Sequence, residues 1–166
     1  MSSYQRVFEQ YYNHIKKLMV LYCCNTQQAE DFTQEAFYRA FKNIDQLREP
    51  EKFKSWVYQI AVNEARKYYN KNEKLVFMDP DTLQHRQENI TEIDTVNVRM
   101  HVSELLYRLD NDSRAILILH YFEDLPINEI ARILDIKEGT VKSRLHRARV
   151  KLRTLLDAEK NGLNII

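Results

Sequence analysis

The sequence contains very few residues that break helices. Only two glycines and three prolines occur among its 166 residues, whereas these two types together make up roughly 12% of an average protein. β-Sandwiches, barrels and small disulfide-rich folds need many glycine or proline turns, and phosphate-binding α/β folds need clustered glycines. The scarcity argues against all of these classes and predicts an all-helical protein.

Long apolar runs are also missing. Stretches such as 115–122 are far shorter than the roughly 18 to 20 residues that a membrane-spanning helix requires. The first residues, MSSYQR, lack the apolar segment of a signal peptide. With 44% hydrophobic and 30% charged residues, the composition is typical of a soluble globular protein, which we expect to stay in the cytoplasm.

Residue patterns for metal binding and catalysis are absent from the sequence. The two cysteines, Cys23 and Cys24, are adjacent, which gives no CxxC pair and no favourable disulfide. They are interpreted as buried or incidental thiols, with a redox-sensing role as the alternative. The five histidines are scattered, and no HExxH, GxSxG or P-loop motif occurs. We therefore expect no metal, no cofactor and no enzymatic activity.

The charges are segregated along the chain although the net charge is only +1. Residues 1–74 carry 12 basic and 9 acidic side chains, residues 75–99 carry 2 and 5, and residues 100–166 carry 11 and 10. Within residues 137–153 there are seven basic side chains and one acidic one. This basic segment is the densest charge feature of the sequence.

Apolar periodicity predicts three helices in the first part of the chain. Phe8 to Tyr22 shows three-and-four spacing, and a second helix is expected to start near Thr26 as N-cap and to run to Phe41. Residues 44–52 include a proline and indicate a loop, and a third helix is expected from Phe53 to about Asn72.

A second helical block is expected after an acidic stretch. Residues 75–95 lose periodicity and are interpreted as a flexible linker. Beyond them, Asp112 or Ser113 is expected to cap a helix over 114–122, a short helix covers 127–134, and Thr140 is expected to cap a last helix that ends near residue 159. The fold class is thus all-α, with two small helical domains, 1–74 and 96–166. Because each core is small, docking on a partner would help to hold them.

The last two helices have the outline of a helix-turn-helix. The motif consists of a short helix, a turn of about four residues and a longer basic helix. In helix-turn-helix proteins the second helix lies in the major groove of DNA. Val141, Leu145 and Ala148 fall on one stripe suited to packing, which leaves a polar and basic side exposed. Arg144 lies near the core edge and is expected to brace the domain. The candidate DNA-binding residues are Thr140, Lys142, Ser143, His146, Arg147, Arg149 and Arg153. A solvated basic face or a surface for a partner helix is the alternative.

Three stretches together resemble a known family. They are AEDFTQEAF at 29–37, FKSWVYQIAVN at 53–63, and EIA at 129–131 followed by GTVKSRLHRAR at 139–149. In this order and spacing they resemble the extracytoplasmic-function (ECF) sigma factors, small bacterial subunits that direct RNA polymerase to promoters. The resemblance implies a sigma region 2-like domain at 1–74 and a region 4-like domain at 96–166, which would recognise the −35 element.

The resemblance implies that the helix over 30–41 contacts core RNA polymerase, at the clamp helices of its largest subunit. The side chains of Asp31, Gln34, Glu35 and Tyr38 lie off the aromatic stripe of this helix and offer a polar, acidic patch to a partner. Charged side chains of this kind are usually only solvated surface. The implied contacts are Glu30, Asp31, Gln34, Glu35 and Tyr38.

The resemblance also implies that the loop 45–55 and the exposed face of the next helix read the promoter −10 element as single-stranded DNA. Capturing flipped bases requires base-edge hydrogen bonds, stacking surfaces and phosphate contacts. The candidates are Lys52, Lys54, Trp56, Gln59, Asn63, Arg66, Lys67 and Tyr69. For Trp56 a core position is the alternative to a stacking platform.

Some positions depart from the family pattern. Asp110 follows Leu109 where proline is customary, Pro126 stands where serine or threonine usually caps a helix, and Asp135 occupies a turn position where glycine is common. His146 lies on the reading face and so affects which −35 sequence is preferred. The resemblance further implies an anti-sigma partner that holds the protein inactive. A free-standing helix-turn-helix regulator remains the alternative function.

Overall fold

The computed structural model describes residues 3–76 and 96–162, and within these segments it contains helices and turns but no strand. The expected linker lies outside the described residues, except for its first two positions, which end a helix. The elements of the first block are α1 (Ser3–Cys23), α2 (Thr26–Lys42), the 3-10 turns η1 (Ile44–Gln46) and η2 (Pro50–Lys52), and α3 (Phe53–Val76). Those of the second block are α5 (Val96–Tyr107), α6 (Asn111–Tyr121), α7 (Ile127–Leu134) and α8 (Glu138–Lys160).

The predicted N-caps of α2 and α6 are wrong by one to three residues. Asn25 caps α2, because its side chain accepts a hydrogen bond from the Gln28 amide at 2.9 Å. Asp110 caps α6 in the same way, through the Ser113 amide at 2.9 Å. Asn25 is a better capping residue than the predicted Thr26, whereas Asp110 is of the same rank as Asp112 and Ser113 and caps α6 because the helix starts earlier than predicted.

The start of α8 also differs from the prediction. Thr140 is already inside the helix, and the N-cap is Lys137, which makes no side-chain capping hydrogen bond. Pro126, at the N-cap of α7, likewise supplies no capping oxygen, as expected. Asp135 ends α7 with φ +53, a left-handed conformation, and its amide binds the Ala131 and Arg132 carbonyls. The turn between the last two helices is therefore shaped by an aspartate in a position that favours glycine.

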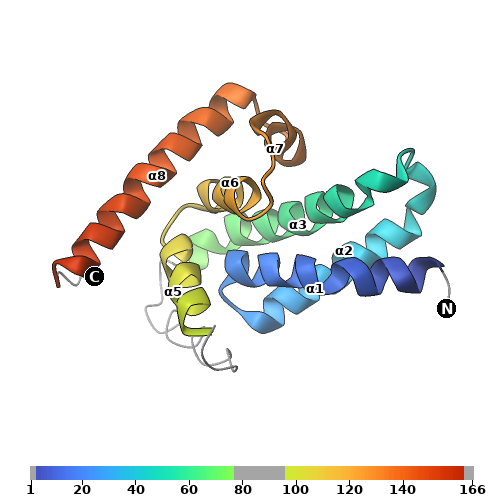
Figure 1. Cartoon of the computed structure of the whole chain (residues 1–166), viewed down its shortest axis with the longest axis horizontal. Helices are drawn as coiled ribbons and strands as arrows, with labels where there is room; N and C mark the ends of the chain where they lie inside the picture. The colour runs from blue at the N-terminus through green and yellow to red at the C-terminus, as the bar shows by residue number, and fades with distance from the viewer. Residues whose placement is uncertain (1–2, 77–95, 163–166) are drawn as a thin grey trace.

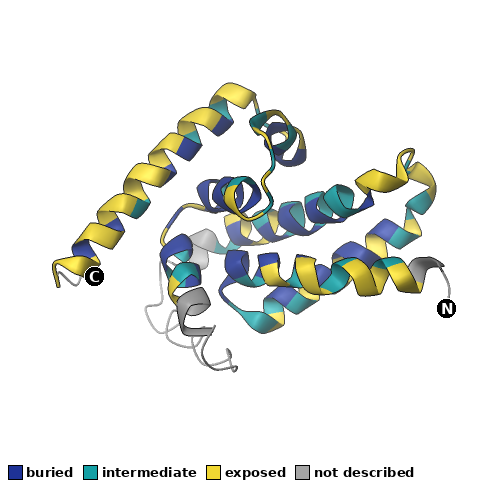
Figure 2. Ribbon diagram, viewed as in Figure 1, coloured by how far each residue is buried: buried dark blue, intermediate teal, exposed yellow. Residues whose placement is uncertain are grey.

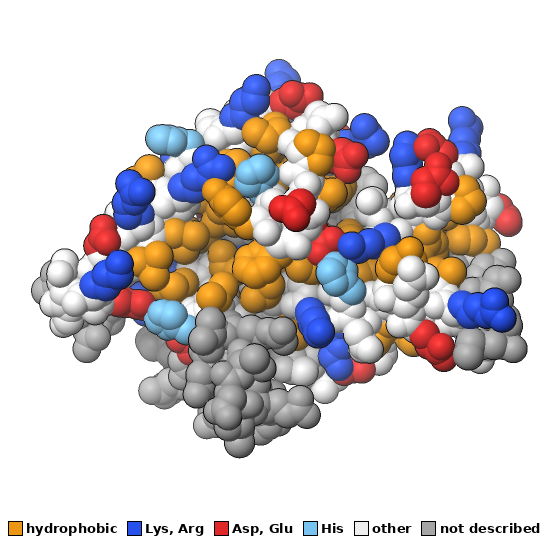
Figure 3. Space-filling view, in the orientation of Figure 1, with side chains coloured by type: hydrophobic (Ala, Val, Ile, Leu, Met, Phe, Trp, Pro, Cys, Tyr) orange, Lys and Arg blue, Asp and Glu red, His pale blue; other side chains and the backbone are white. Residues whose placement is uncertain are grey.

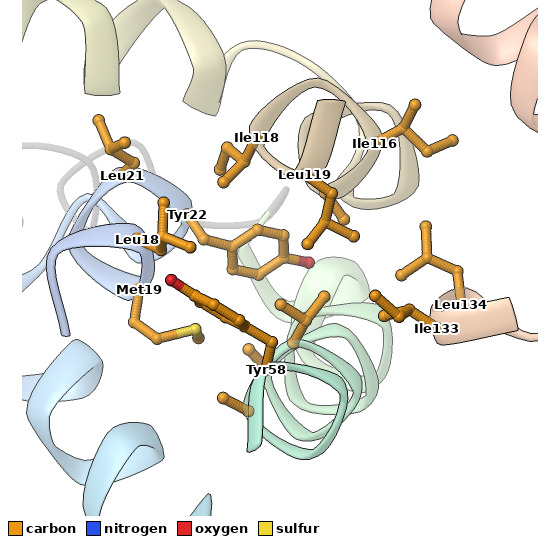
Figure 4. Close-up of a cluster of buried hydrophobic side chains, with 14 of the residues drawn as sticks. Leu18, Met19, Leu21, Tyr22, Tyr58, Ile116, Ile118, Leu119, Ile133 and Leu134 are labelled. Carbon is orange, nitrogen blue, oxygen red and sulfur yellow. The ribbon is translucent and has the colours of Figure 1, made fainter. Parts of the chain in front are cut away.

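Both blocks contribute to one buried hydrophobic cluster. The predicted stripes supply it: Ile15 and Met19 of α1, Val57 of α3, and Ile130 of α7 are fully buried. Figure 2 shows that the buried side of each helix faces its neighbours. In Figure 4, Tyr22 and Tyr58 extend into the space between α1, α3 and α6. The two blocks are thus packed against each other and share a core.

Three helices of the second block, α5, α6 and α7, lie on helices of the first (Figure 1). α5 and α6 contact α1, while α6 and α7 contact α3. α8 packs on α6 and α7 and runs along one side of the molecule, with its amino-terminal end beside α7 (Figure 1). The faces of α1 and α3 that point toward the second block are therefore covered.

Arg114 lies at the centre of this contact. It is 1% exposed, and its guanidinium carbon lies 4.5 Å from the Tyr22 ring centre and 4.7 Å from that of Tyr107. Nη2 donates to Asn111 Oδ1 at 2.7 Å, and Nη1 donates to the Tyr107 carbonyl at 3.3 Å. Burial raises the pKa of Tyr22 to about 12, although the Arg114 charge opposes the shift. A buried cation held by aromatic rings joins α1, α5 and α6.

Cys23 and Cys24 are buried and form no disulfide. Among the described side chains, no group of three or more His, Cys, Asp or Glu is placed to hold a metal ion. The helices of the two described segments include none with the length and hydrophobicity needed to cross a membrane.

Candidate nucleic-acid interface

The outer face of α8 presents the predicted DNA-reading side chains. Val141, Leu145 and Ala148 are buried against the preceding helices, which turns the opposite side outward. The exposed residues on that side are Lys142, Ser143, His146, Arg147, Arg149 and Arg153, and Thr140 is partly buried. In Figure 3 a band of lysine and arginine side chains follows this edge of the molecule. The exposed side of α8 therefore carries hydrogen-bonding side chains in its amino-terminal half and further cationic side chains along its length.

Two of these side chains have their orientation fixed by neighbours. The Arg149 guanidinium lies over the ring of Tyr121, 5.4 Å from its centre, and Nε donates to the phenol oxygen. Ser143 Oγ donates to the Thr140 carbonyl at 3.1 Å, which leaves its oxygen lone pairs as acceptors. Tyr121 was not predicted as a site residue, because nothing in the sequence places it beside α8.

A second candidate surface is a groove along α3. Its volume is about 340 Å³, and it is lined by Arg39, Asn43, Gln46, Trp56, Gln59, Ile60, Asn63, Glu64 and Lys67. Four of these residues were predicted to contact the −10 element. Trp56 is partly buried; it packs against the core and also lines the groove. The position of Trp56 therefore agrees in part with the core alternative, and its role as a stacking platform stays a prediction.

Two predicted −10 residues are engaged by the second block. Asn63 Nδ2 donates to the Ile133 carbonyl at 2.9 Å. Arg66 donates to Asp112 Oδ1 at 2.8 Å and to the Leu134 carbonyl at 3.2 Å. Burial lowers the pKa of Arg66. The side chains of Asn63 and Arg66 therefore contact α6 and α7.

The predicted lysines of this surface make ion pairs of different kinds. Lys52 pairs with Glu49 at 2.8 Å within its own loop, and Lys67 lies 3.4 Å from Glu64 on α3. Lys54 instead pairs at 3.1 Å with Glu123, in the turn after α6. Lys54 is therefore a contact between the two blocks.

The structure contradicts the predicted exposure of Tyr69. Its side chain is in the core and only 4% exposed. Its hydroxyl donates to Gln28 Oε1, and its ring packs 5.8 Å from that of Tyr22. The prediction failed because Tyr69 follows Asn63 by six residues, which on a helix rotates it away from the Asn63 side toward the packed face.

The outer face of α2 carries the predicted polymerase contacts. Asp31, Gln34, Glu35 and Tyr38 are exposed, and Tyr38 is 61% exposed. Glu30 is partly covered by Lys16, whose ammonium lies 2.7 Å from its carboxylate. The hydrogen bonds from Lys16 and Tyr12 lower the pKa of Glu30.

Ion pairs connect this α2 face with the α3 groove. Arg39 pairs with Glu35 at 2.5 Å and, through Nη1, with Glu64 at 2.9 Å. Periodicity alone predicted neither Arg39 nor Glu64, because their pairing depends on how α2 packs on α3. The acidic side chain in the groove is therefore neutralised from the neighbouring helix.

Both blocks match models of known protein families. Residues 7–75 match the family "Sigma-70 region 2", and residues 99–152 match "Sigma-70, region 4". The chain is 33% identical over 147 residues to the RNA polymerase sigma factor SigV of Bacillus subtilis. This alignment covers 86% of the present chain and 84% of SigV. It is 32% identical over 144 residues to the ECF RNA polymerase sigma factor SigW of the same organism, covering 80% and 77%. This chain belongs to the ECF sigma factor family.

Two solved structures share the fold. The sigma factor RpoE of Bartonella quintana, solved in complex with the anti-sigma factor NepR, has a TM-score of 0.70 and 22% identity, covering 95% of this chain and 98% of that one. CnrH, solved with the cytosolic domain of CnrY, has a TM-score of 0.68 and 21% identity, covering 93% and 88%. The ECF family assignment makes the chain a transcription initiation factor and favours the sigma factor function over a free-standing regulator.

Proposed function

We propose that this ECF sigma factor binds core RNA polymerase and directs it to promoters by contacting two DNA elements. The α3 groove and the loop before it contact the −10 element as single-stranded DNA, and the exposed face of α8 contacts the −35 element. Catalysis then belongs to the polymerase, and the protein acts in the cytoplasm where the polymerase is.

The observation that carries this proposal is the outer face of α8. Ser143, His146 and Arg147 are exposed in the amino-terminal half of a helix that follows α7 and a short turn. In helix-turn-helix proteins, this part of the second helix contacts base edges in the major groove. The exposed Lys142 and Arg149 flank these residues and meet the DNA backbone.

The −10 contacts are supported by the groove along α3. It combines an indole, two amides and a lysine from Trp56, Gln59, Asn63 and Lys67. Such a set allows stacking on one base, hydrogen bonds to its edge and a phosphate contact. Tyr69 is not included, because it is buried.

The two contacts act through separate parts of the chain. We propose that residues 1–74 and 96–166 are the functional domains and that residues 75–95 join them. Two weak DNA contacts on one chain gain effective concentration, so that promoter affinity depends on the polymerase holding both domains at the right spacing.

The α2 face is proposed as the docking surface for the polymerase. Asp31, Glu35 and Tyr38 are exposed together on it, and acidic and aromatic side chains suit a basic partner helix. Glu30 and Gln34 extend the same face. An anti-sigma factor is proposed as the regulator, because the sigma factor RpoE of Bartonella quintana, which has a similar fold, was solved in complex with the anti-sigma factor NepR.

The proposal is tested by run-off transcription with purified core polymerase and a library of promoters. We expect initiation at a subset of promoters only when the chain and the core are both present, and little promoter binding by the chain alone. The double variant Asp31→Ala, Glu35→Ala is expected to lose core binding, while Glu9→Ala, an exposed acidic residue of α1, is the matched control. A chain that does not bind core, or that binds palindromic DNA as a dimer without it, overturns the proposal.

A further inference from the structure

One predicted −35 residue of α8 is held by a side chain of another helix. The guanidinium carbon of Arg149 lies 5.4 Å from the ring centre of Tyr121, the last residue of α6, and Arg149 Nε donates to the Tyr121 hydroxyl oxygen. Ser143 and Arg147, by contrast, donate to carbonyls of α8 itself. The direction of the Arg149 side chain is therefore set by α6, on which α8 packs.

Tyr121 is itself held by its neighbours, although its side chain is on the surface. The residue is 53% exposed. The ring of His120 lies 4.9 Å from that of Tyr121 in an edge-to-face arrangement, which is a favourable geometry for aromatic rings. His120 Nδ1 in turn donates to the Leu125 carbonyl at 3.2 Å, in the turn between α6 and α7. The phenol therefore has a defined place beside α8.

The contact leaves hydrogen-bond donors unused on both side chains. The Tyr121 oxygen accepts from Arg149, but its own O–H has no acceptor among the residues that the structure describes. With Nε occupied, both NH2 groups of Arg149 remain available, and no carboxylate in the two described segments pairs with them. A hydroxyl donor beside a cation that lacks an acidic partner is suited to bind a phosphate.

The pair lies on the flank of α8 that carries other predicted phosphate contacts. At about 100° per residue, Lys142, Arg149 and Arg153 fall within about 40° of one another around the helix axis. All three are exposed. Tyr121, Arg149 and Arg153 also line one groove of about 440 Å³. A DNA strand that follows this flank of the helix would meet these cations in turn.

We propose that Tyr121 and Arg149 together bind one backbone phosphate of the −35 DNA, with the Tyr121 O–H and the Arg149 NH2 groups as donors. This inference rests on the proposed function of α8. Arg149 supplies the charge, while Tyr121 supplies a further donor and fixes the guanidinium before DNA arrives. Because neither group contacts a base edge, the pair strengthens binding to every −35 sequence without selecting among them.

The role of Tyr121 follows from the cost of ordering a long side chain. A free arginine loses rotamer freedom when it binds a ligand, whereas the side chain of Arg149 is already ordered against Tyr121. The planar guanidinium can also bond to the phenol through Nε and to a phosphate through its NH2 groups. A lysine ammonium lacks this fork, so Arg149→Lys is expected to keep only part of the affinity.

The test locates the phosphate with neutral backbone linkages. Holoenzyme is assembled from core polymerase and the full-length chain, and its affinity is measured for promoter duplexes in which one phosphate near the −35 element is replaced by a methylphosphonate. We expect the parent to bind about tenfold more weakly when the contacted phosphate is neutral, as for the loss of a charge-assisted hydrogen bond. Arg149→Ala should no longer respond to that linkage, and Tyr121→Phe should respond less than the parent at the same phosphate.

Tyr121→Phe isolates the hydroxyl, because the ring that Arg149 stacks on is kept. On unmodified promoters we expect roughly threefold to tenfold weaker binding, whatever the −35 sequence. The double variant Tyr121→Phe, Arg149→Ala should lose less than the product of the two single losses, since the residues act as a unit. Tyr68→Phe is the matched control, because Tyr68 is an exposed tyrosine of α3; it should keep the parental affinity and the parental response to each linkage.

A parental response to every linkage in Tyr121→Phe overturns the inference, even if its affinity falls, because such a loss is only structural. Responses lost at different phosphates in Tyr121→Phe and Arg149→Ala overturn it as well. Run-off transcription with core separates this result from the proposed function. If the parent transcribes and Tyr121→Phe keeps the parental pattern, the phosphate site alone is wrong. If the parent does not transcribe, the proposed function is wrong and the phosphate site falls with it.

Discussion

The guanidinium of Arg114 lies 4.5 Å from the ring centre of Tyr22, in the buried region where the two blocks meet. The residues are 92 positions apart, and their contact joins α1 to α6. Asn111 adds to it, since its side-chain oxygen accepts from Arg114 and its carbonyl accepts from the Tyr22 hydroxyl at 3.4 Å.

Replacing Arg114 is expected to destabilise the whole molecule. Arg114→Ala removes a buried side chain and leaves Asn111 Oδ1 and the Tyr107 carbonyl without their donor, which should cost about 3 kcal/mol in the free energy of unfolding. Arg114→Met keeps most of the volume and should cost about 1 to 2 kcal/mol. Urea unfolding followed by circular dichroism measures both. A cost below about 0.5 kcal/mol for Arg114→Ala would show that the cation contributes nothing.

Asp110 should make stability depend on pH in the acid range. Partial burial would raise the pKa of its carboxyl, but hydrogen bonds from Ser113 and the charge of Arg144 lower the pKa below its usual value. The folded state therefore holds the proton less tightly than the unfolded state. The contribution to stability is complete above the unfolded pKa of about 4 and is lost as the pH falls through the folded value.

Two substitutions separate the cap of Asp110 from its charge. Asp110→Ala should cost about 1 kcal/mol at pH 7, because the Ser113 amide loses its acceptor. Asp110→Asn keeps a capping oxygen, so its free energy of unfolding at pH 7 should be close to that of the parent. Because it has no carboxyl group, it should lose less stability than the parent as the pH falls. Thermal unfolding between pH 3 and pH 7 gives both values. Equal acid sensitivity in Asp110→Asn and the parent would contradict the assignment.

Arg147 and Arg149 should have different effects on −35 recognition. Arg147→Ala is expected to cost roughly 1 to 3 kcal/mol at one base position, since its exposed guanidinium is placed for a base edge. Arg149 is held over Tyr121, so Arg149→Ala should weaken binding to all sequences and reduce the salt slope by about one unit. Holoenzyme binding to promoter variants at several salt concentrations measures this. Equal loss on every sequence for Arg147→Ala would refute its role in base reading.

Tyr69→Phe should affect folding rather than promoter opening. The substitution removes the hydroxyl that binds Gln28 and keeps the ring in place, so we expect a loss of about 1 kcal/mol in stability. Permanganate reactivity of the opened −10 strand should be unchanged in the holoenzyme. A variant of normal stability that fails to open promoters would restore Tyr69 to the DNA-binding surface.

Asp135→Gly should stabilise the turn before α8. Asp135 has φ +53, and glycine takes this conformation without the steric cost that other residues meet, so we expect a gain of up to about 1 kcal/mol. Asp135→Val is the contrasting variant and should be destabilising. Thermal unfolding of both measures the strain, and an unchanged midpoint for Asp135→Val would argue against it.

The sequence was sufficient to predict the helices and most of the side chains that α8 exposes. Periodicity located the buried stripes, since Val141, Leu145 and Ala148 are all in the core. Helix ends were less predictable, because capping depends on which of several neighbouring oxygens reaches an amide, as Asn25 and Asp110 show. The contacts between the blocks could not be predicted, because Asn63 and Ile133 are 70 positions apart and their pairing depends on tertiary packing.

The core that both blocks share has an evolutionary consequence. Because side chains of both blocks fill the same buried cluster, a change of volume on one side affects the packing of the other. Substitutions in the two blocks are therefore expected to be coupled, with a loss on one side compensated by a gain on the other. The side chains around Arg114 are where such paired changes are expected, while the exposed residues of α8 are free to change independently of the core.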